Sequence, residues 1–416
     1  PLRLVGSEMC IRDRLLCISS FSQAVNSCED KTFWQTWYQG GQFKGFGISP
    51  TKEAVAKAQY FFAENHYKGN LLTKDYKRAL DLFKKAAHAG LPQAYFRLGL
   101  MNHYGQGKSK DLKSAYTYYE HAAKINNPEA QFNLGLMNRY GIGTKKNLYA
   151  AFDWFTKSAN SQAILNQNKC TKIMKGIAEA QFNLGLMNHY ALGTAKNMFE
   201  AAKWYEIAAA HNMKEAQFNL AQLFFTGEGV DYDIDRAIEN YLLAAKQGLA
   251  EAQLNLAQIY HYGPSHLQNY RKAHQWYLEA ANQDVKEAYF NLGLMAQYGR
   301  GVHQNYVSAK HYYLQSASLK IPESYLNLGF IYHYGLGTPV NNDKAFEYFD
   351  KAASQGIHQA EYHLGIHYRD GRGVTKNNDI ANYWFKKAKA KDLKEKDYIN
   401  DSFAFREPDD VDLYVK

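Results

Sequence analysis

At 416 residues, with 46% hydrophobic and 15% aromatic side chains, the chain has ample material for a folded core, which argues against an intrinsically disordered protein. Its formal net charge of +9 comes mostly from lysines spread along the chain, a pattern typical of a solvated surface, so we expect no nucleic-acid partner. No apolar run approaches the roughly 18 residues that a membrane-spanning helix needs, so we expect no transmembrane segment.

The N-terminal stretch resembles a secretory leader. Leu15–Ala24 is a short apolar segment that follows Arg12 and Arg14 and ends in small residues, as in a signal peptide cleaved after Ala24. We expect residues 1–24 to be a signal peptide or an artefactual N-terminus, followed by an N-terminal extension over residues 25–57. The protein is then periplasmic or secreted, with the cytoplasm as the alternative.

A repeated unit follows this extension. The phrase EAQFNLGLMN occupies Glu129–Asn138 and recurs unchanged at Glu179–Asn188. Aligned on the alanine of this phrase, which we call the anchor, the chain contains nine copies 36 residues apart, except for one interval of 50 residues, which is 36 plus a 14-residue insertion. The anchor positions are Ala58, Ala94, Ala130, Ala180, Ala216, Ala252, Ala288, Ser324 and Ala360. This period predicts one repeat array over residues 58–390.

Each copy is predicted to form two helices joined by a glycine-containing turn. In Pro128–Tyr140 the apolar residues recur at helical spacing and indicate a first helix, helix A. Gly141 and Gly143 follow, and glycine readily adopts the left-handed conformation that ends a helix. Six residues after the first turn glycine, every copy has Asp or Asn, the preferred N-cap of a second helix, helix B. These caps are Asp75, Asp111, Asn147, Asn197, Asp233, Asn269, Asn305, Asn341 and Asn377.

Small and large residues alternate in the pattern expected of interlocking helices. Helix B has alanine four residues after its cap and an aromatic residue four residues later, whereas helix A has Gly or Ala at its centre in copies two to nine. A helical Gly costs roughly 1 kcal/mol, so close approach of a neighbouring helix is expected there. The aromatic residues are Phe83, Tyr119, Phe155, Tyr205, Tyr241, Tyr277, Tyr313, Phe349 and Phe385.

The insertion and the C-terminal end depart from the period. The insertion lies within residues 161–176 and is expected to extend helix B or to loop outward, leaving the stacking of copies three and four intact. Cys170 lies in it, and a disulfide with Cys28 in an exported protein is left open. Residues 391–416 lack the repeat pattern and are expected to form a C-terminal cap and tail.

The consensus EAQFNLGLM, followed by YGxGT and by the alanine and aromatic pattern of helix B, resembles the Sel-one-like repeat (SLR), a relative of the tetratricopeptide repeat. This resemblance implies an all-α fold, a right-handed α-solenoid of about nine 36-residue helix-turn-helix repeats. Since such repeats serve mainly as protein-binding scaffolds, we expect a non-enzymatic scaffold or adaptor that binds a protein or peptide in its concave groove. The alternatives are a cytosolic or host-directed effector adaptor and a cell-wall polysaccharide-binding protein whose partner is an envelope polymer.

Motifs that carry catalysis are missing from the sequence. There is no nucleophile elbow, no HExxH and no CxxC. His363 and His367, four residues apart, could bring two imidazoles to one metal ion, but the sequence offers no third ligand at a suitable spacing. We therefore expect no catalytic residue, no metal and no cofactor.

The candidate partner-binding residues lie on the face of helix A opposite the anchor. They stand two and nine residues after it, about 180–200° around the helix, and resemblance to related repeats places this face on the concave surface. The alternative is that the Phe residues are inter-repeat core and the His residues bond locally. If the face binds a ligand, acidic or extended peptides should be favoured, more tightly below about pH 6.5. The residues are Phe96, His103, Phe132, Arg139, Phe182, His189, Phe218, Phe225, His261, Phe290, Gln297, His333 and Arg369.

Overall fold

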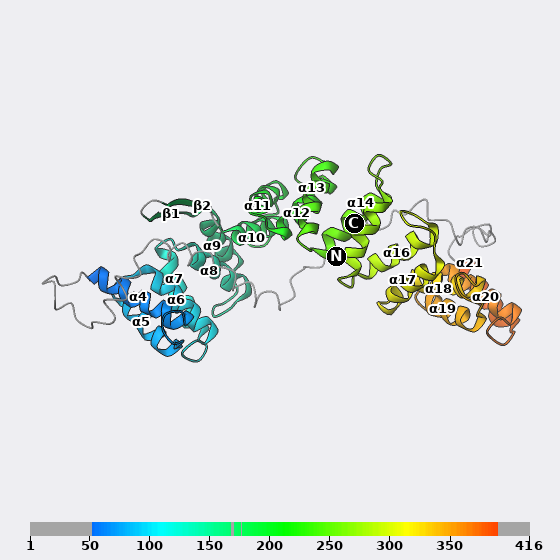
Figure 1. Ribbon diagram of the computed structural model, residues 1–416, viewed down its shortest axis with the longest axis horizontal. Helices are drawn as coiled ribbons and strands as arrows, with labels where there is room; N and C mark the ends of the chain where they lie inside the picture. Colours follow the sequence, from blue (N-terminus) through cyan, green and yellow to red (C-terminus); the bar gives the residue numbers. More distant parts are fainter. Residues whose placement is uncertain (1–51, 168–169, 176, 390–416) are drawn as a thin grey trace. The chain divides into compact units, whose positions relative to one another are not determined.

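The computed structural model describes residues 52–167, 170–175 and 177–389, which contain 18 helices and one two-stranded hairpin (Figure 1). The helices form nine helix-turn-helix pairs, so the fold is the expected all-α solenoid. Helix A of the nine copies is α4 (Lys52–Lys68), α6 (Pro92–Tyr104), α8 (Pro128–Tyr140), α10 (Ala178–His189), α12 (Lys214–Thr226), α14 (Ala250–Tyr262), α16 (Lys286–Tyr298), α18 (Pro322–Tyr334) and α20 (His358–Asp370). Helix B is α5 (Tyr76–His88), α7 (Leu112–Lys124), α9 (Leu148–Asn160), α11 (Met198–Ala210), α13 (Ile234–Lys246), α15 (Tyr270–Ala281), α17 (Tyr306–Ser318), α19 (Asn342–Ser354) and α21 (Asn378–Lys389).

The chain divides into two compact units. Unit 1 is Pro1–Met213 with Glu228–Asp231, and unit 2 is Lys214–Gly227 with Tyr232–Lys416. The predicted signal peptide, the first part of the predicted extension and the predicted C-terminal cap lie outside the described residues. Among the helices of the described ranges, none is long and apolar enough to cross a membrane.

The Asp and Asn caps of helix B are confirmed. Asp111 Oδ1 accepts a hydrogen bond from the backbone N–H of Ser114 at 3.0 Å, and Asn147 Oδ1 accepts one from Ala150 at the same distance. Such a bond satisfies one of the free N–H groups at a helix start and contributes about 1 kcal/mol. Helix A in most copies ends at a left-handed glycine such as Gly141, whose φ is 72°, whereas Ala191 takes this place in copy four and Gly263 in copy six is extended.

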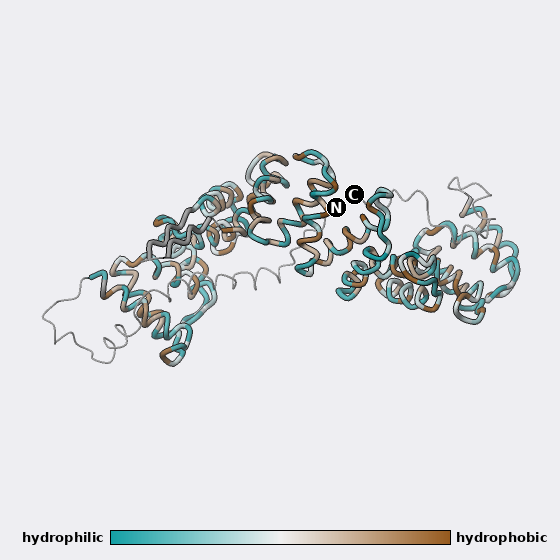
Figure 2. The backbone as a smooth tube through the Cα atoms, turned by 45° about the horizontal axis from the view of Figure 1, so that its top comes forward, coloured by the Kyte–Doolittle hydropathy of each residue, from teal (hydrophilic) through white to brown (hydrophobic). Residues whose placement is uncertain are grey.

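The interlocking of small and large residues is also confirmed. A Cβ placed on Gly135 would lie 2.5 Å from Cδ1 of Phe155, so the ring of helix B occupies the space that a side chain on helix A would need. The helix B alanine of the same copy, Ala151, is fully buried beside that ring. Figure 2 shows hydrophobic and hydrophilic residues alternating along the helices. Gly at the centre of helix A is a packing requirement.

The insertion takes a form that the sequence interpretation did not consider. It neither extends helix B nor forms a plain loop: β1 (Gln162–Gln167) pairs antiparallel with β2 (Cys170–Lys175), with Ala163 opposite Met174. Pairing the two strands satisfies backbone groups that have no helix to join. The stacking of copies three and four is intact, as expected, because one hydrophobic cluster contains both Phe155 of α9 and Leu184 of α10. Cys28 lies outside the described residues, so its pairing with Cys170 stays a prediction.

Candidate functional site: the end of helix A

The phenylalanines two residues after the anchor pack against helix B of their own copy. Phe96 lies 5.9 Å from Tyr119 between ring centroids, and Phe182 lies 5.8 Å from Tyr205. The same contact recurs at Phe132, Phe218 and Phe290. Phe132 is buried and the other four are half-buried, so these rings combine a packing role with a partly accessible edge.

In several copies, the residue nine positions after the anchor contacts the tyrosine of helix B. In three copies whose helix B has tyrosine, the ninth residue contacts its hydroxyl group within hydrogen-bond distance. These contacts are His189 Nδ1 to Tyr205 at 3.3 Å, His261 Nδ1 to Tyr277 at 3.4 Å and Gln297 Oε1 to Tyr313 at 2.9 Å. His103 lies beside Tyr119, with ring centroids 6.3 Å apart.

Where helix B has phenylalanine instead, the ring has no hydroxyl group to which the ninth residue could bond. In copies three, eight and nine the ninth residue is Arg139, His333 or Arg369. In copy five the ninth residue is Phe225, half-buried, and the hydroxyl of Tyr241 accepts from Asn255 Nδ2 at 3.3 Å. The ninth residue therefore serves the helix B hydroxyl group in copies four, six and seven, a relation that the sequence interpretation missed. In copy two the hydroxyl of Tyr119 and Nδ1 of His103 are buried without a hydrogen bond.

Burial lowers the pKa of His103, His189 and His261, three histidines of this face. Desolvation, with a smaller effect of Lys110, lowers the pKa of His103 to about 4. Desolvation, together with Arg300, lowers the pKa of His261 to about 3. Burial also lowers the pKa of His189. The expected gain of imidazole charge just below pH 6.5 is therefore wrong for His103 and His261, because protonating either would place a charge in a desolvated site.

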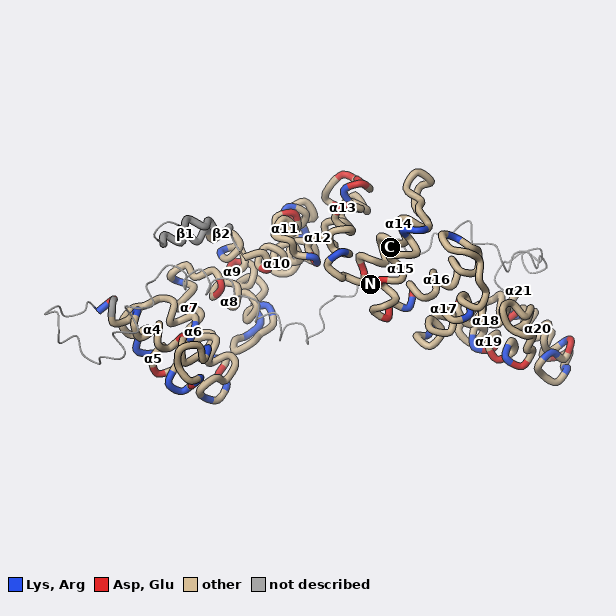
Figure 3. Tube along the Cα trace, in the orientation of Figure 1, with Lys and Arg blue, Asp and Glu red and all other residues tan. Residues whose placement is uncertain are grey.

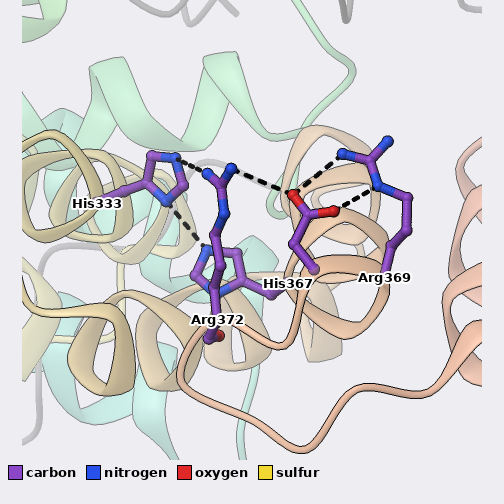
Figure 4. A network of polar contacts seen from close by, with 5 residues as sticks. His333, His367, Arg369 and Arg372 are labelled. Atoms are coloured by element: carbon purple, nitrogen blue, oxygen red, sulfur yellow. Dashed lines mark hydrogen bonds and ion pairs between the residues drawn. The ribbon is translucent and has the colours of Figure 1, made fainter.

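His333 and His367 meet at the junction of the last two copies, beside Arg369 and Arg372 (Figure 4). His367 Nδ1 donates to the backbone carbonyl of Arg372 at 2.6 Å, so its Nε2, 3.1 Å from His333 Nδ1, is the acceptor of that second bond. Arg372 Nη1 lies 3.5 Å from the remaining nitrogen of His333, and Asp370 pairs with both Arg372 and Arg369. This chain of donors and acceptors is complete with neutral imidazoles.

His333 is a third imidazole near His363 and His367 that the sequence interpretation did not place there, because it comes from the preceding copy. Its ring centroid lies 6.2 Å from that of His363, whose own ring stacks on Phe349 at 5.0 Å. The nitrogens of His333 and His367 face each other across a hydrogen bond. Among the described side chains, no group of three or more His, Cys, Asp or Glu is arranged to hold a metal.

Exposed tyrosines occupy the next position, the last residue of helix A or the one directly after it. Tyr140, Tyr190 and Tyr262 are 45%, 39% and 44% exposed, and we call them the exposed tyrosines. Each is backed by its neighbour at the ninth position: the guanidinium of Arg139 lies 5.3 Å from the Tyr140 ring, and His189 and His261 stack on their tyrosines at 4.3 and 3.9 Å. Tyrosine before the turn in six copies was the sequence signal for this feature.

The family model of the Sel1 repeat matches nine stretches of the chain. They are residues 56–91, 92–127, 128–162, 178–213, 214–249, 250–285, 286–320, 322–357 and 358–393. No curated protein matches the chain.

Two solved structures show similar folds. A protective antigen of uropathogenic Escherichia coli that displays an SLR fold is 28% identical, with a TM-score of 0.71 over 88% of this chain and 78% of its own. A Sel1 repeat protein from Oxalobacter formigenes is 24% identical, with a TM-score of 0.55 over 84% of this chain and 95% of its own, a likeness of fold alone.

Proposed function

This chain belongs to the Sel1 repeat family, and we propose that it is a non-enzymatic scaffold that binds a partner protein or peptide along the ends of its A helices. Proteins of this family are generally protein-interaction scaffolds. The observation that carries the proposal is the exposed tyrosines, because an aromatic ring held half in water by a supporting neighbour is a typical anchor of protein interfaces. Half-buried members of the candidate face, such as Phe96 and Phe182, offer further partly accessible aromatic rings.

A peptide selection tests this proposal. A display library of random peptides is selected against the full chain, and the affinity of the enriched peptides is measured for two variants. Tyr140→Ala with Tyr190→Ala should weaken binding about tenfold or more, since each anchor ring contributes about 1 kcal/mol or more. The control, Ile125→Ala with Ile207→Ala, removes exposed apolar side chains from helix B ends and should change affinity less than about twofold.

Two results would contradict the proposal: a library that yields no specific binder, or binders that are indifferent to Tyr140 and Tyr190. Purified peptidoglycan is the competing ligand, because tyrosine rings also stack on sugars. If the protein sedimented with peptidoglycan in a tyrosine-dependent way and bound no peptide, the partner would be an envelope polymer and not a protein.

The proposal places this scaffold outside the cytoplasm. It is supported by the leader-like stretch Leu15–Ala24. Expression with a C-terminal tag, followed by fractionation and mass measurement, should yield a mature chain that begins at Val25 in the periplasm or medium. An uncleaved cytoplasmic chain would favour the cytosolic adaptor.

A further inference from the structure

The turns between helix A and helix B in copies two to four form one continuous edge of unit 1. These turns, residues 105–111, 141–147 and 191–197, are called the loop edge. The Cα of Gly143 lies against the backbone carbonyl of Leu112, the first residue of helix B in the preceding copy, and Gly107 and Gly193 make the same contact with Tyr76 and Leu148. Because each turn rests on the copy before it, side chains of successive turns line the same edge.

The loop edge is basic. It carries five exposed lysines, and its one carboxylate, Asp111, caps helix α7 and forms an ion pair with Lys108. The backbone N–H of Ser114 is the largest of the contacts that lower the pKa of Asp111 to about 2. The lysines are Lys108, Lys110, Lys145, Lys146 and Lys196; Figure 3 colours them blue. In unit 2, the turns at 263–269, 299–305 and 335–341 contain one arginine and no lysine, whereas the last turn, 371–377, contains Arg372 and Lys376. The turn of copy five, 227–233, contains three carboxylates and no lysine, so copies two to four form a run of three successive basic turns.

Tyr140 and Tyr190 directly precede two of these turns, so an exposed ring and the lysines of a turn belong to the same copy. His189 stacks directly on Tyr190. Desolvation lowers the pKa of His189, whereas Glu228 in the turn of the next copy raises it and Lys196 lowers it by a smaller amount. The positive charge is therefore clearest in the turn that follows Tyr140.

We propose that the loop edge, with Tyr140 and Tyr190, binds an extended acidic segment of a partner protein, whose carboxylates pair with the lysines while its apolar side chains pack on the tyrosine rings. The inference rests on the proposed scaffold function and names the chemistry of the partner. Complementary charges fix the register of the bound segment and speed its association. The tyrosine rings provide contact area.

The spacing of the copies sets the spacing of the carboxylates. Side chains of successive A helices touch, since Arg139 of α8 donates to Asn183 of α10. We take the spacing of the copies to be about 8–10 Å, which is typical of packed helices. An extended segment advances about 3.3 Å per residue, so about three of its residues span one copy. The fitting segment has an acidic residue at every third position.

Fluorescence anisotropy with the full chain tests this. The probes are a labelled peptide with Asp at every third position and a central Tyr, a peptide of the same composition with contiguous Asp, a peptide with Lys in place of Asp, and a single-stranded oligonucleotide. Lys145→Glu with Lys146→Glu and Lys196→Glu reverses charge on the loop edge. Lys85→Glu with Lys124→Glu and Lys157→Glu reverses the same charge in the last turns of helices α5, α7 and α9, at the opposite end of each copy.

We expect the spaced acidic peptide to bind most tightly, and more weakly at about 300 mM than at about 50 mM salt, because exposed charges are screened. Reversing the charges of the loop edge should weaken the binding of the spaced acidic peptide about tenfold or more, whereas the control substitutions should weaken it less than about twofold. An oligonucleotide that binds more tightly, a contiguous peptide that binds equally well, or a loop-edge variant within about twofold of wild type would overturn the inference. If the selected peptides still depend on Tyr140 and Tyr190 in that case, the scaffold function stands and only the acidic partner is wrong.

Discussion

In three copies the hydroxyl group of the helix B tyrosine bonds to the residue nine positions after the anchor. His261 and Tyr277 are 16 residues apart in the chain, and each lies on a different helix, so helical periodicity alone does not connect them. The sequence predicted the recurring aromatic residue of helix B and the recurring polar residue near the end of helix A separately. Only the structure shows that residues of the two columns hydrogen-bond to each other. Part of the candidate face therefore makes hydrogen bonds within the protein.

His261 gives a direct test of this pairing. His261→Leu leaves the buried hydroxyl of Tyr277 without its partner and should lower the free energy of unfolding by about 1–3 kcal/mol. His261→Gln should cost less than about 1 kcal/mol, because Gln297 makes the same contact in the next copy. Urea denaturation measures both. Equal losses for Leu and Gln would show that size, and not the hydrogen bond, matters at this position.

The same residue predicts how stability depends on pH. Burial lowers the pKa of His261 to about 3 in the folded chain, below the value of about 6.5 expected when it is unfolded. Its contribution is therefore fully present above about pH 6.5 and is lost as the pH falls toward about 3. Urea midpoints at about pH 7, 5.5 and 4.5 should fall in that order, and less steeply for His261→Gln. A variant with an unchanged pH profile would contradict the assignment to this residue.

Ala191 tests the cost of a left-handed residue. It replaces the first turn glycine of copy four and still adopts a φ of 55°. Since an L-residue pays roughly 1–2 kcal/mol there, Ala191→Gly should stabilise the chain by about 1 kcal/mol. The same substitution within helix α11, Ala209→Gly, should destabilise by about 0.5–1 kcal/mol. Thermal melting that moves both variants in one direction would contradict this explanation.

At the scale of the elements, the caps, turn glycines and helix pairs could be predicted because each depends on residues within one copy. The hairpin of the insertion could not, since its 14 residues belong to no copy and have no repeated pattern to compare. The exposed tyrosines were visible in sequence as a column before the turn, but their exposure depends on the neighbouring copy. Local rules therefore predicted the elements, and contacts between copies determined the surface.

Deletion of the insertion tests whether the hairpin is independent of the array. Removing Gln162–Lys175 should leave cooperative unfolding and the urea midpoint nearly unchanged, because the cluster around Phe155 and Leu184 joins α9 to α10 without it. Circular dichroism against urea is the measurement. Loss of cooperativity, or a second transition, would show that the hairpin supports the stacking of copies three and four.

At the scale of the whole molecule, a repeat array offers one type of surface many times, and variation among copies decides where a partner binds. The loop edge of unit 1 differs in charge from the turn 335–341 of unit 2, which contains no lysine or arginine, while the framework of cap and glycines is the same. A scaffold built this way can change its partner by substitutions at turn positions that fold stability does not use.

Hydrogen–deuterium exchange of the full chain with and without the spaced acidic peptide tests the central claim most directly. The account predicts slower exchange in the turns 105–111, 141–147 and 191–197 and in the last turns of α6, α8 and α10, and unchanged exchange in the last turns of α5, α7 and α9. Protection confined to those helix B ends, or none in the three turns at a saturating peptide concentration, would contradict it.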